Sequence, residues 1–236
     1  MGWETREVWR QESLEQPGCD PRWRDRTYAQ FVWVNALLSR WRTLYCRYLR
    51  PQWRTGDSRS LLDLGCGAAD VPLAIQRWAA ADGVTVHLTL ADTEPAVMEW
   101  LRQRGVAELP GVTLAVADSG TLRASGQPFD AVICNHLLHH LRDAEVTLLL
   151  ADMAAMAGQV AIANDLARSR LAWLLFAASY GLICHRSYLV PDGLTSLRRS
   201  FTAAELRPLL PPGWTLENLP LFRLVACWQA AEIGRT

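Results

Sequence analysis

The chain has 236 residues, and its 24 basic residues balance its 24 acidic residues, so its formal net charge is zero. Half of the residues are hydrophobic and a fifth are charged, a composition that fills a packed core and argues against extended disorder. Zero net charge argues against a protein-wide attraction to nucleic acid or to an anionic membrane. Because every basic residue is Arg and none is Lys, a Schiff-base lysine and the lysine of a P-loop nucleotide site are excluded.

The first 55 residues differ in composition from the rest of the chain. They hold six of the eleven Trp and ten of the 24 Arg, and apolar residues recur at helical spacing from Tyr28 to Leu49. We therefore expect residues 1–55 to form a helical N-terminal cap that packs on a domain spanning residues 56–236.

From Arg59 onward, short apolar runs alternate with helical segments, which is typical of βαβ units and a mainly parallel sheet. Pro72 and Pro95 lie near the first turns of two expected helices, and Thr202 with Glu205 has the pattern of a capping box. The two last runs are expected to be antiparallel edge strands. The fold class is thus α/β, with a seven-stranded, mostly parallel sheet sandwiched by helices. The predicted strands are Leu61–Leu64, Val86–Ala91, Val112–Ala117, Phe129–Cys134, Gln159–Ala163, Trp214–Leu219 and Leu221–Trp228.

Residues 166–200 are too long for an ordinary connection and are expected to form a second helical cap, inserted after the fifth strand. Their apolar run, Leu171–Cys184, is shorter than the roughly 20 residues that cross a bilayer, so no transmembrane segment is expected. The six cysteines are widely spaced without a C-x-x-C pair, and the polar N-terminus does not resemble a signal peptide. A cytoplasmic location is the expectation.

Several of the predicted parallel strands end at a polar residue. In an open α/β sheet, ligands bind beyond the carboxyl ends of the strands. We therefore expect these polar side chains to converge on one crevice. The residues concerned are Asp63, Asp92, Asp118, Asn135 and Asn164.

The first strand leads into a glycine turn, with the sequence Leu-Asp-Leu-Gly-Cys-Gly-Ala-Ala-Asp over residues 62–70. In a nicotinamide or flavin site the last position of G-x-G-x-x-G is small, because the pyrophosphate lies on the helix N-terminus. Here that position is Asp70, which together with Asp63 would repel a diphosphate. Carboxylates instead complement an adenosyl cofactor that carries a sulfonium and an ammonium group, and S-adenosylmethionine is such a molecule.

The expected cofactor contacts come from the glycine turn and from the ends of the next three strands. Asp92 is placed to accept hydrogen bonds from the ribose hydroxyls, and Asp118 with Ser119 to bind the adenine amino group. Each residue also fits a simple turn-forming role; their joint placement favours the site. The expected cofactor-binding residues are Asp63, Gly65, Cys66, Gly67, Asp70, Asp92, Thr93, Asp118, Ser119 and Asn135.

These motifs resemble those of the class I S-adenosylmethionine-dependent methyltransferases. The family's first motif is matched by residues 63–67, with Ala69 in place of the usual third glycine, and its later acids are matched by Asp92 and Asp118. The stretch Asn-His-Leu-Leu-His-His-Leu at 135–141 is similar to one in the quinone-biosynthesis-like branch. The resemblance implies a Rossmann-like fold and an enzyme of the methyltransferase class.

A finer resemblance concerns the second half of the chain. Residues 164–170 and the segments Phe201-Thr202 and Glu205-Leu206 are similar to bacterial methyltransferases of phenolic-lipid and type III polyketide pathways. That similarity implies a role in secondary metabolism and O-methylation of a hydroxyl on a hydrophobic acceptor, aromatic in character. The family resemblance is best over residues 58–165 and looser elsewhere.

Three of the five histidines, His136, His139 and His140, follow the fourth strand near the expected position of the cofactor's methyl group. A phenol, with a pKa of about 10, gains from a base as its proton leaves, and we favour His139 for this role, with packing as the alternative. His185 is a further candidate from the second cap. His136 and His140 have the spacing of a metal-binding pair, but no Cys or carboxylate cluster completes a site, so no metal is expected.

Several alternatives stay open at this point. C-methylation of a quinol-type ring needs the same fold and cofactor, and the same scaffold could serve a non-methylating cyclase or a partner-binding subunit. A nicotinamide reductase is disfavoured by Asp70, and nucleic-acid methylation by the zero net charge. The sequence leaves the oligomeric state open, with a homodimer as one option.

Overall fold

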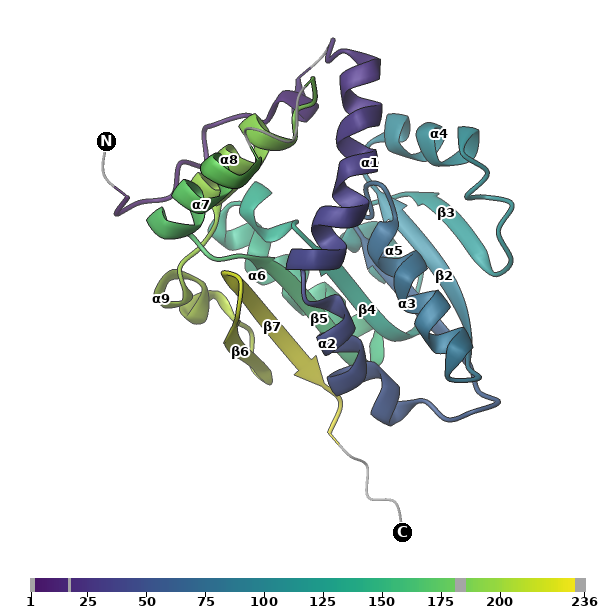
Figure 1. Ribbon diagram of the computed structural model, residues 1–236. Helices are drawn as coiled ribbons and strands as arrows, with labels where there is room; N and C mark the ends of the chain where they lie inside the picture. The colour runs from purple at the N-terminus through teal and green to yellow at the C-terminus, as the bar shows by residue number, and fades with distance from the viewer. Residues whose placement is uncertain (1–2, 17, 181–185, 232–236) are drawn as a thin grey trace.

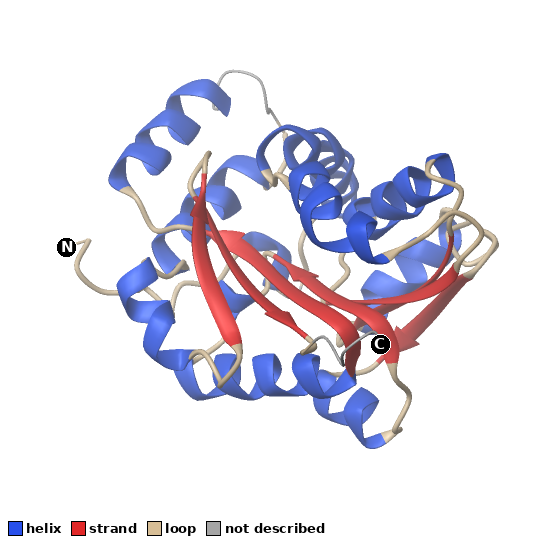
Figure 2. Cartoon of the chain, turned by 90° about the horizontal axis from the view of Figure 1, so that it is seen from below, coloured by secondary structure: helices blue, strands red, loops and turns tan. Residues whose placement is uncertain are grey.

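The computed structural model describes residues 3–16, 18–180 and 186–231, and within them the chain forms one seven-stranded sheet with helices on both sides (Figures 1 and 2). The strand order is β3-β2-β1-β4-β5-β7-β6, with β7 antiparallel to both of its neighbours and all other pairs parallel. This confirms the predicted α/β fold and its antiparallel edge. The strands are β1 Ser58–Leu64, β2 Thr85–Asp92, β3 Val112–Val116, β4 Phe129–Asn135, β5 Ala157–Leu166, β6 Trp214–Leu219 and β7 Arg223–Gln229.

Six of the seven predicted strands differ from the structure at one end or both, and two of these differences have a clear cause. The fifth strand is longer than the expected Gln159–Ala163, because β7 pairs with it as far as Leu166. The seventh begins at Arg223 rather than at Leu221, because Leu221 and Phe222 both have positive φ and form the turn from β6. Apolar character alone does not reveal that turn.

Alternate residues of each strand enter two separate cores, as the twofold period of a strand requires. Leu61 and Ile133 belong to the core beneath the helices of one face, while Leu62 and Val132 belong to the core of the other. The first face is covered by α2 Trp41–Leu44 with the turns η2 Tyr45–Leu49 and η3 Arg50–Gln52, α3 Asp70–Ala81 and α4 Pro95–Gln103. The second is covered by α5 Ser119–Ala124, α6 Asp143–Met156, α9 Ala203–Leu206 and η5 Arg207–Leu209.

The helix signals of the sequence are confirmed. Pro95 is the first residue of α4, and Pro72 lies in the first turn of α3. The Thr202 hydroxyl accepts a hydrogen bond from the Glu205 N–H, while the Glu205 carboxylate accepts one from the Thr202 N–H, so the capping box that opens α9 is complete.

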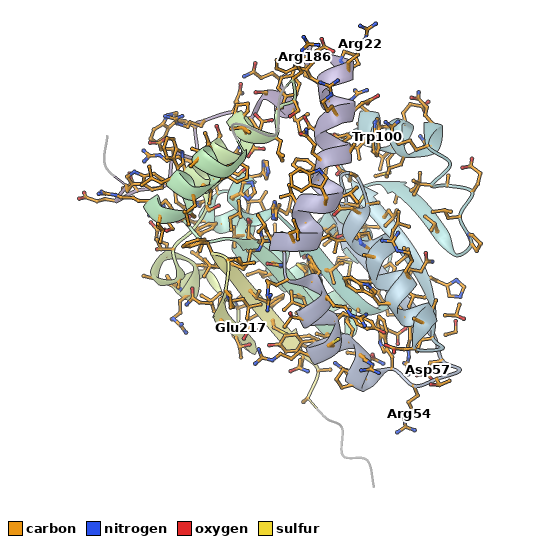
Figure 3. All side chains as sticks on the ribbon, viewed as in Figure 1. Arg22, Arg54, Asp57, Trp100, Arg186 and Glu217 are labelled. Carbon is orange, nitrogen blue, oxygen red and sulfur yellow. The ribbon has the colours of Figure 1, made fainter. Side chains whose placement is uncertain are left out.

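The N-terminal region is helical, as expected, and several polar contacts tie it to the sheet domain. Its long helix, α1 Pro21–Leu38, is capped by the Asp20 carboxylate, and the Trp100 indole of α4 donates a hydrogen bond to Asp25. Further along, Arg47 and Tyr48 both donate to Glu217 of β6 (Figure 3). These polar contacts hold the region across one face of the sheet.

The second expected cap consists of α7 Arg170–Tyr180 and α8 Leu189–Arg199. Val34 and Phe31 of α1 pack against Leu189 of α8 and Phe176 of α7, so the two cap regions meet beyond the carboxyl ends of the strands (Figure 1). His185 lies outside the described residues. Within those residues, no helix combines the length and apolarity needed to span a bilayer.

The segment before α1, which includes the short turn η1 Ser13–Glu15, runs along α8. The Glu7 N–H donates to the Arg198 carbonyl, and the N–H groups of Ser13 and Leu14 both donate to the Asp192 carboxylate. This extended stretch carries Glu12 to the crevice at the end of the sheet, a placement that the sequence patterns do not indicate.

Candidate active site

A cavity of about 1180 Å³ opens at the carboxyl ends of the strands, between the sheet and the two cap regions. It exceeds the usual range of small-ligand sites, roughly 300–1,000 Å³, so it has room for a cofactor and a second molecule together. All of the cofactor-binding and histidine residues expected from the sequence line it. They are Asp63, Gly65, Cys66, Gly67, Asp70, Asp92, Thr93, Asp118, Ser119, Asn135, His136, His139 and His140.

The glycine turn after β1 shows why two of its positions lack side chains. Gly65 and Gly67 have φ of +68° and +48°, in the region that favours glycine. A Cβ on Gly65 would meet Leu137 at 3.0 Å, whereas one on Gly67 would meet nothing within 4 Å. The Gly67 N–H donates to Asp92 at 3.2 Å, which joins the turn to the end of β2. Gly67 therefore keeps this part of the cavity wall open.

Three carboxylates surround this turn. The Asp63 side chain is only 2% exposed, and its Oδ1 has no hydrogen-bond partner among the described residues. Asp70 accepts a hydrogen bond from the Asn35 amide at 3.0 Å. Burial, together with the charges of Asp70 and Asp92, raises the pKa of Asp63 well above its ordinary value. This end of the cavity is therefore poor in cationic partners and complements a ligand with positive charge.

Asp118 and Ser119 lie at the cavity, but their side chains already have protein partners. Asp118 accepts a hydrogen bond from the Thr121 N–H at 2.7 Å and caps α5, and the Ser119 hydroxyl donates to Asp152 at 2.7 Å. The structure thus shows the turn-forming role for Asp118. Contacts of these two residues with an adenine ring stay a prediction.

The residues directly after β4 do not form an α-helix. Asn135 ends β4, and its side-chain oxygen Oδ1 accepts hydrogen bonds from the Trp41 indole and from Arg223. His136 has a positive φ of 58°, and residues 138–140 make a single 3-10 turn, η4. The three histidine rings consequently have separate environments.

His136 is held by Arg223, a buried arginine on β7. The Arg223 guanidinium donates to Nε2 of His136 at 2.5 Å. Burial, followed by the charge of Arg223, lowers the pKa of His136 well below its ordinary value. Since its Nε2 lone pair is already engaged, His136 is not placed to take a proton from a ligand.

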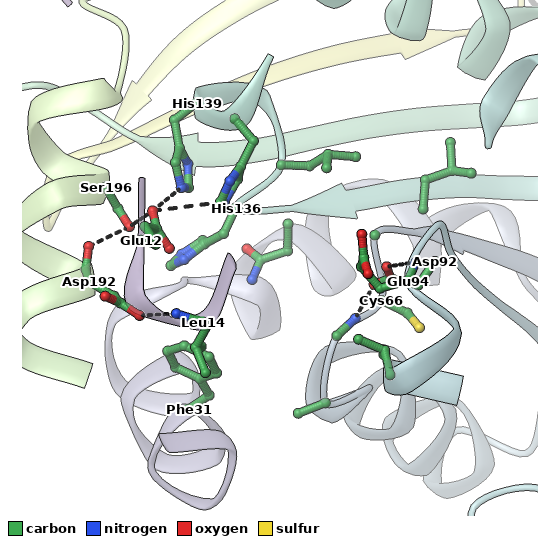
Figure 4. Close-up of a pocket in the computed structure, with 18 of the residues that line it drawn as sticks. Glu12, Leu14, Phe31, Cys66, Asp92, Glu94, His136, His139, Asp192 and Ser196 are labelled. Carbon is green, nitrogen blue, oxygen red and sulfur yellow. Dashed lines mark hydrogen bonds and ion pairs between the residues drawn. The ribbon is translucent and has the colours of Figure 1, made fainter. Parts of the chain in front are cut away.

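His139 is buried between two carboxylates. Its Nδ1 lies 2.7 Å from Asp165 Oδ1, and its backbone N–H donates to Asp165 Oδ2. On the other side its Nε2 lies 3.4 Å from Glu12 Oε1 (Figure 4). Burial alone would lower the pKa of His139, but Asp165 and Glu12 outweigh it and raise the pKa to about 9. At neutral pH the ring therefore carries both protons, and a positive group faces the cavity.

Glu12 is the centre of the polar cluster at this end of the cavity. Its Oε1 accepts a hydrogen bond from the Ser196 hydroxyl at 2.6 Å and lies 4.0 Å from His140 Nε2. In Figure 4 Glu12, His139 and Ser196 lie on one side of the pocket, and Asp92 and Cys66 lie on the other. The cavity therefore has two distinct ends, one with three carboxylates around the glycine turn and one with a histidine held by carboxylates.

Two residues of the site were not found by sequence reasoning. Asp165 directly follows Asn164 near the carboxyl end of β5. Polar residues at strand ends were the expected site residues, so extending that choice by one position on β5 would have included Asp165. Glu12 lies in an extended segment that is remote in sequence from every motif, and no local pattern marks it.

Comparison with known proteins agrees with this architecture. Residues 61–158 match the family model of a methyltransferase domain. A search of curated proteins finds no significant match.

Similar solved structures span nearly the whole chain. The plantazolicin methyltransferase BpumL in complex with SAH is 11% identical, with a TM-score of 0.65 and 93% of each chain covered. The magnesium protoporphyrin IX methyltransferase ChlM from Synechocystis PCC 6803 with bound SAH is 16% identical, with a TM-score of 0.53 and coverage of 94% of this chain and 93% of that one. The CurJ carbon methyltransferase is 17% identical, with a TM-score of 0.53, and this match covers 77% of the present chain and 51% of the CurJ chain. At these identities the similarity shows the fold.

Proposed function

We propose, from the class I methyltransferase fold of this chain and the methyltransferase domain that it matches over residues 61–158, that it transfers a methyl group from S-adenosylmethionine to a hydrophobic small molecule. The favoured reaction is O-methylation of a phenolic or polyketide-derived hydroxyl.

The observation that supports the cofactor assignment is the buried Asp63 carboxylate beside the glycine turn, whose Oδ1 has no hydrogen-bond partner in the described parts of the chain. Asp70 and Asp92 lie close enough to raise its pKa, so the three acids form a strongly electronegative end. S-adenosylmethionine brings an ammonium and a sulfonium group but no phosphate, and these charges complement the acids. Asp92, adjacent to the open face of Gly67, would bind the ribose hydroxyls.

The end of the cavity that contains Glu12 and His139, called here the acceptor end, has apolar walls and one polar cluster. Phe31 and Leu14 line the cavity beside Glu12 (Figure 4), and Phe176 and Leu189 line it from the second cap. An acceptor with an apolar, aromatic body and a hydroxyl directed to His139 fits this arrangement.

Bound S-adenosylmethionine would supply a methyl group for direct transfer to the acceptor oxygen and would leave as S-adenosylhomocysteine. The protein aligns the two molecules. Because the raised pKa of His139 keeps its ring doubly protonated near neutrality, we assign it the role of holding the acceptor oxygen as negative charge develops. The proton of the hydroxyl passes by way of the Glu12 carboxylate to solvent, because the effect of burial is outweighed by the neighbouring histidines and Ser196, which lower the pKa of Glu12, and it does not retain the proton. In this proposal His139 stabilises the oxyanion and does not act as the base.

A thermal-unfolding experiment tests the cofactor. S-adenosylmethionine and S-adenosylhomocysteine are expected to raise the melting temperature, because a ligand at 100 times its dissociation constant adds about 2.7 kcal/mol to the free energy of unfolding. NADH is expected to have no effect. A shift with NADH alone, or no shift with either adenosyl ligand, contradicts the proposal.

Product analysis separates the chemistries that share this site. Incubation with phenolic and quinol acceptors is expected to yield S-adenosylhomocysteine and an O-methyl ether. A new carbon–methyl bond would assign C-methylation of the ring instead. Cofactor binding with no S-adenosylhomocysteine over the acceptor panel would favour a non-methylating role.

Replacing Asp63 by Asn is expected to stabilise the cofactor-free protein while weakening cofactor binding. The raised pKa of Asp63 means that its ionisation opposes folding as pH rises above the ordinary value of about 4. The gain in the free energy of unfolding should be about 1–2 kcal/mol at pH 8 and smaller at pH 5, and affinity for S-adenosylmethionine should fall at least about tenfold. Denaturant unfolding at both pH values and calorimetric titration measure the two effects.

Asp57→Asn is the matched control, at the opposite end of the sheet (Figure 3). A hydrogen bond from the Arg54 N–H and the Arg59 guanidinium lower the pKa of Asp57, so this substitution should lower stability and leave cofactor affinity unchanged. A destabilised Asp63→Asn variant with normal cofactor affinity would contradict the role given to Asp63.

A further inference from the structure

We propose that Glu12, His139 and His140 form a binding site for a divalent transition-metal cation at the acceptor end of the cavity. The three residues come from two distant parts of the chain, the N-terminal segment and the η4 turn. One donor atom from each, two imidazole nitrogens and a carboxylate oxygen, lies within 4.8 Å of the others.

The separations suit a shared ion. Two donor atoms at about 2.0–2.1 Å from a tetrahedral zinc ion are about 3.4 Å apart, and His139 Nε2 lies 3.4 Å from Glu12 Oε1. His140 Nε2 is 4.0 Å from the same oxygen. The His140 side chain is 29% exposed, so a small rotation brings its ring to the ion without disturbing the core.

The second observation is the state of His139 itself. Its ring is 1% exposed, and its Nε2 is buried without a hydrogen bond of acceptable geometry, facing Glu12. Its other nitrogen, Nδ1, is held by Asp165 at 2.7 Å. A carboxylate that fixes the far nitrogen of an imidazole is the usual support for a histidine ligand, because it sets the ring orientation and directs the Nε2 lone pair at the metal.

The surroundings determine the class of ion. Two imidazoles and one carboxylate suit zinc and its neighbours cobalt, nickel and iron(II) better than magnesium or calcium, which prefer oxygen ligands. Negative charge from Asp165, and from Asp192 beside the Glu12 segment, favours a cation here. Arg199, with Nη1 4.0 Å from Glu12 Oε1, opposes it. Arg6, whose Nη2 donates to the His139 carbonyl at 3.4 Å, and Arg223, whose charge acts on Asp165, also oppose it. The inference therefore rests on the three donor atoms and their separations.

Three protein ligands leave at least one coordination position, and all three residues line the cavity. A bound cation would displace the Nε2 proton that His139 carries in the metal-free protein, and its charge would replace that of the protonated ring. An acceptor oxygen would bind at the open position as an oxyanion, so the ion would act on an acceptor with a phenolic or enolic hydroxyl. This last step rests on the proposed function; the cation site itself does not. The sequence patterns predict no metal because they show no third ligand near the two histidines. In the folded chain Glu12 lies beside them and provides this ligand.

Cobalt(II) titration of the metal-free chain, without cofactor, tests the site, since bound cobalt has a visible absorption that reports its ligands. We expect one site per chain, with affinity reduced at least tenfold in Glu12→Gln and in His140→Ala. His87→Ala is the matched control, because His87 is exposed on β2, outside the cavity, and its removal should leave cobalt binding unchanged. Circular dichroism confirms that each variant is folded.

The outcomes are distinguishable from those of the cofactor experiment. No cobalt site, or equal affinity in all variants, overturns the cation inference and leaves methyl transfer standing if S-adenosylmethionine still binds. A cobalt site that Glu12→Gln and His140→Ala weaken, in a chain that does not bind S-adenosylmethionine, supports the cation site and contradicts the proposed function.

Discussion

Replacement of Gly67 by Val is expected to abolish S-adenosylmethionine binding, with an affinity loss of at least about 100-fold, or about 2.8 kcal/mol. A Cβ at this position meets no atom of the described residues within 4 Å, so the Val side chain would extend into space that the cofactor is expected to occupy. The positive φ of Gly67 adds a cost to folding of about 1–2 kcal/mol for a residue other than glycine. Calorimetric titration with S-adenosylmethionine measures the affinity.

Gly126→Val separates ligand exclusion from backbone strain. Gly126 also has positive φ, +71°, and open space at its Cβ position, but it lies in the loop after α5 and does not line the cavity. Both variants should lose similar stability in thermal unfolding, and only the Gly67 variant should lose the cofactor. Normal affinity in Gly67→Val would mean that the cofactor lies elsewhere.

The sequence predicts well those parts of the fold that depend on local patterns, namely the apolar runs of the strands, the turn residues between them and the polar residues at strand ends. Apolar runs bounded by turn residues locate all seven strands, and four of the five polar residues expected at strand ends line one cavity, because parallel strands share one carboxyl edge. The fifth, Asn164, is buried and donates to the Ser39 carbonyl instead. Asp63, Asp92 and Gly67 consequently lie at one cavity, as predicted.

The acceptor end was predicted only in part, because its geometry depends on tertiary contacts that have no local signal. His139 gains its properties from Asp165 on β5 and from Glu12, which are 26 and 127 residues away in sequence. Arg223 on β7 engages His136 in the same way. A cluster of three histidines in sequence therefore separates into rings with opposite pKa shifts, and only the packed chain reveals which ring faces a ligand.

His139→Asn is expected to lower the turnover number by roughly 10²–10³-fold, the loss that follows removal of one donor to a developing oxyanion. The Asn amide keeps a donor to Asp165 in place of Nδ1, so the buried carboxylate stays paired, but it has no group in the position of Nε2. Because the cofactor residues lie at the other end of the cavity (Figure 4), the dissociation constant for S-adenosylmethionine should stay within about threefold. Formation of S-adenosylhomocysteine with the best acceptor of the panel gives the turnover number.

This split between turnover and cofactor affinity distinguishes a group that touches the acceptor from one that merely supports the fold. A structural role would lower stability, turnover and cofactor affinity together. His139→Ala removes the charged partner of the buried Asp165 and leaves it only backbone donors, so this variant should lose stability in addition to turnover. His87→Asn, the same change at an exposed position on β2, should alter neither quantity. Full activity in His139→Asn would remove this histidine from the mechanism and with it the proton transfer assigned to Glu12, since the two residues act on the same acceptor oxygen.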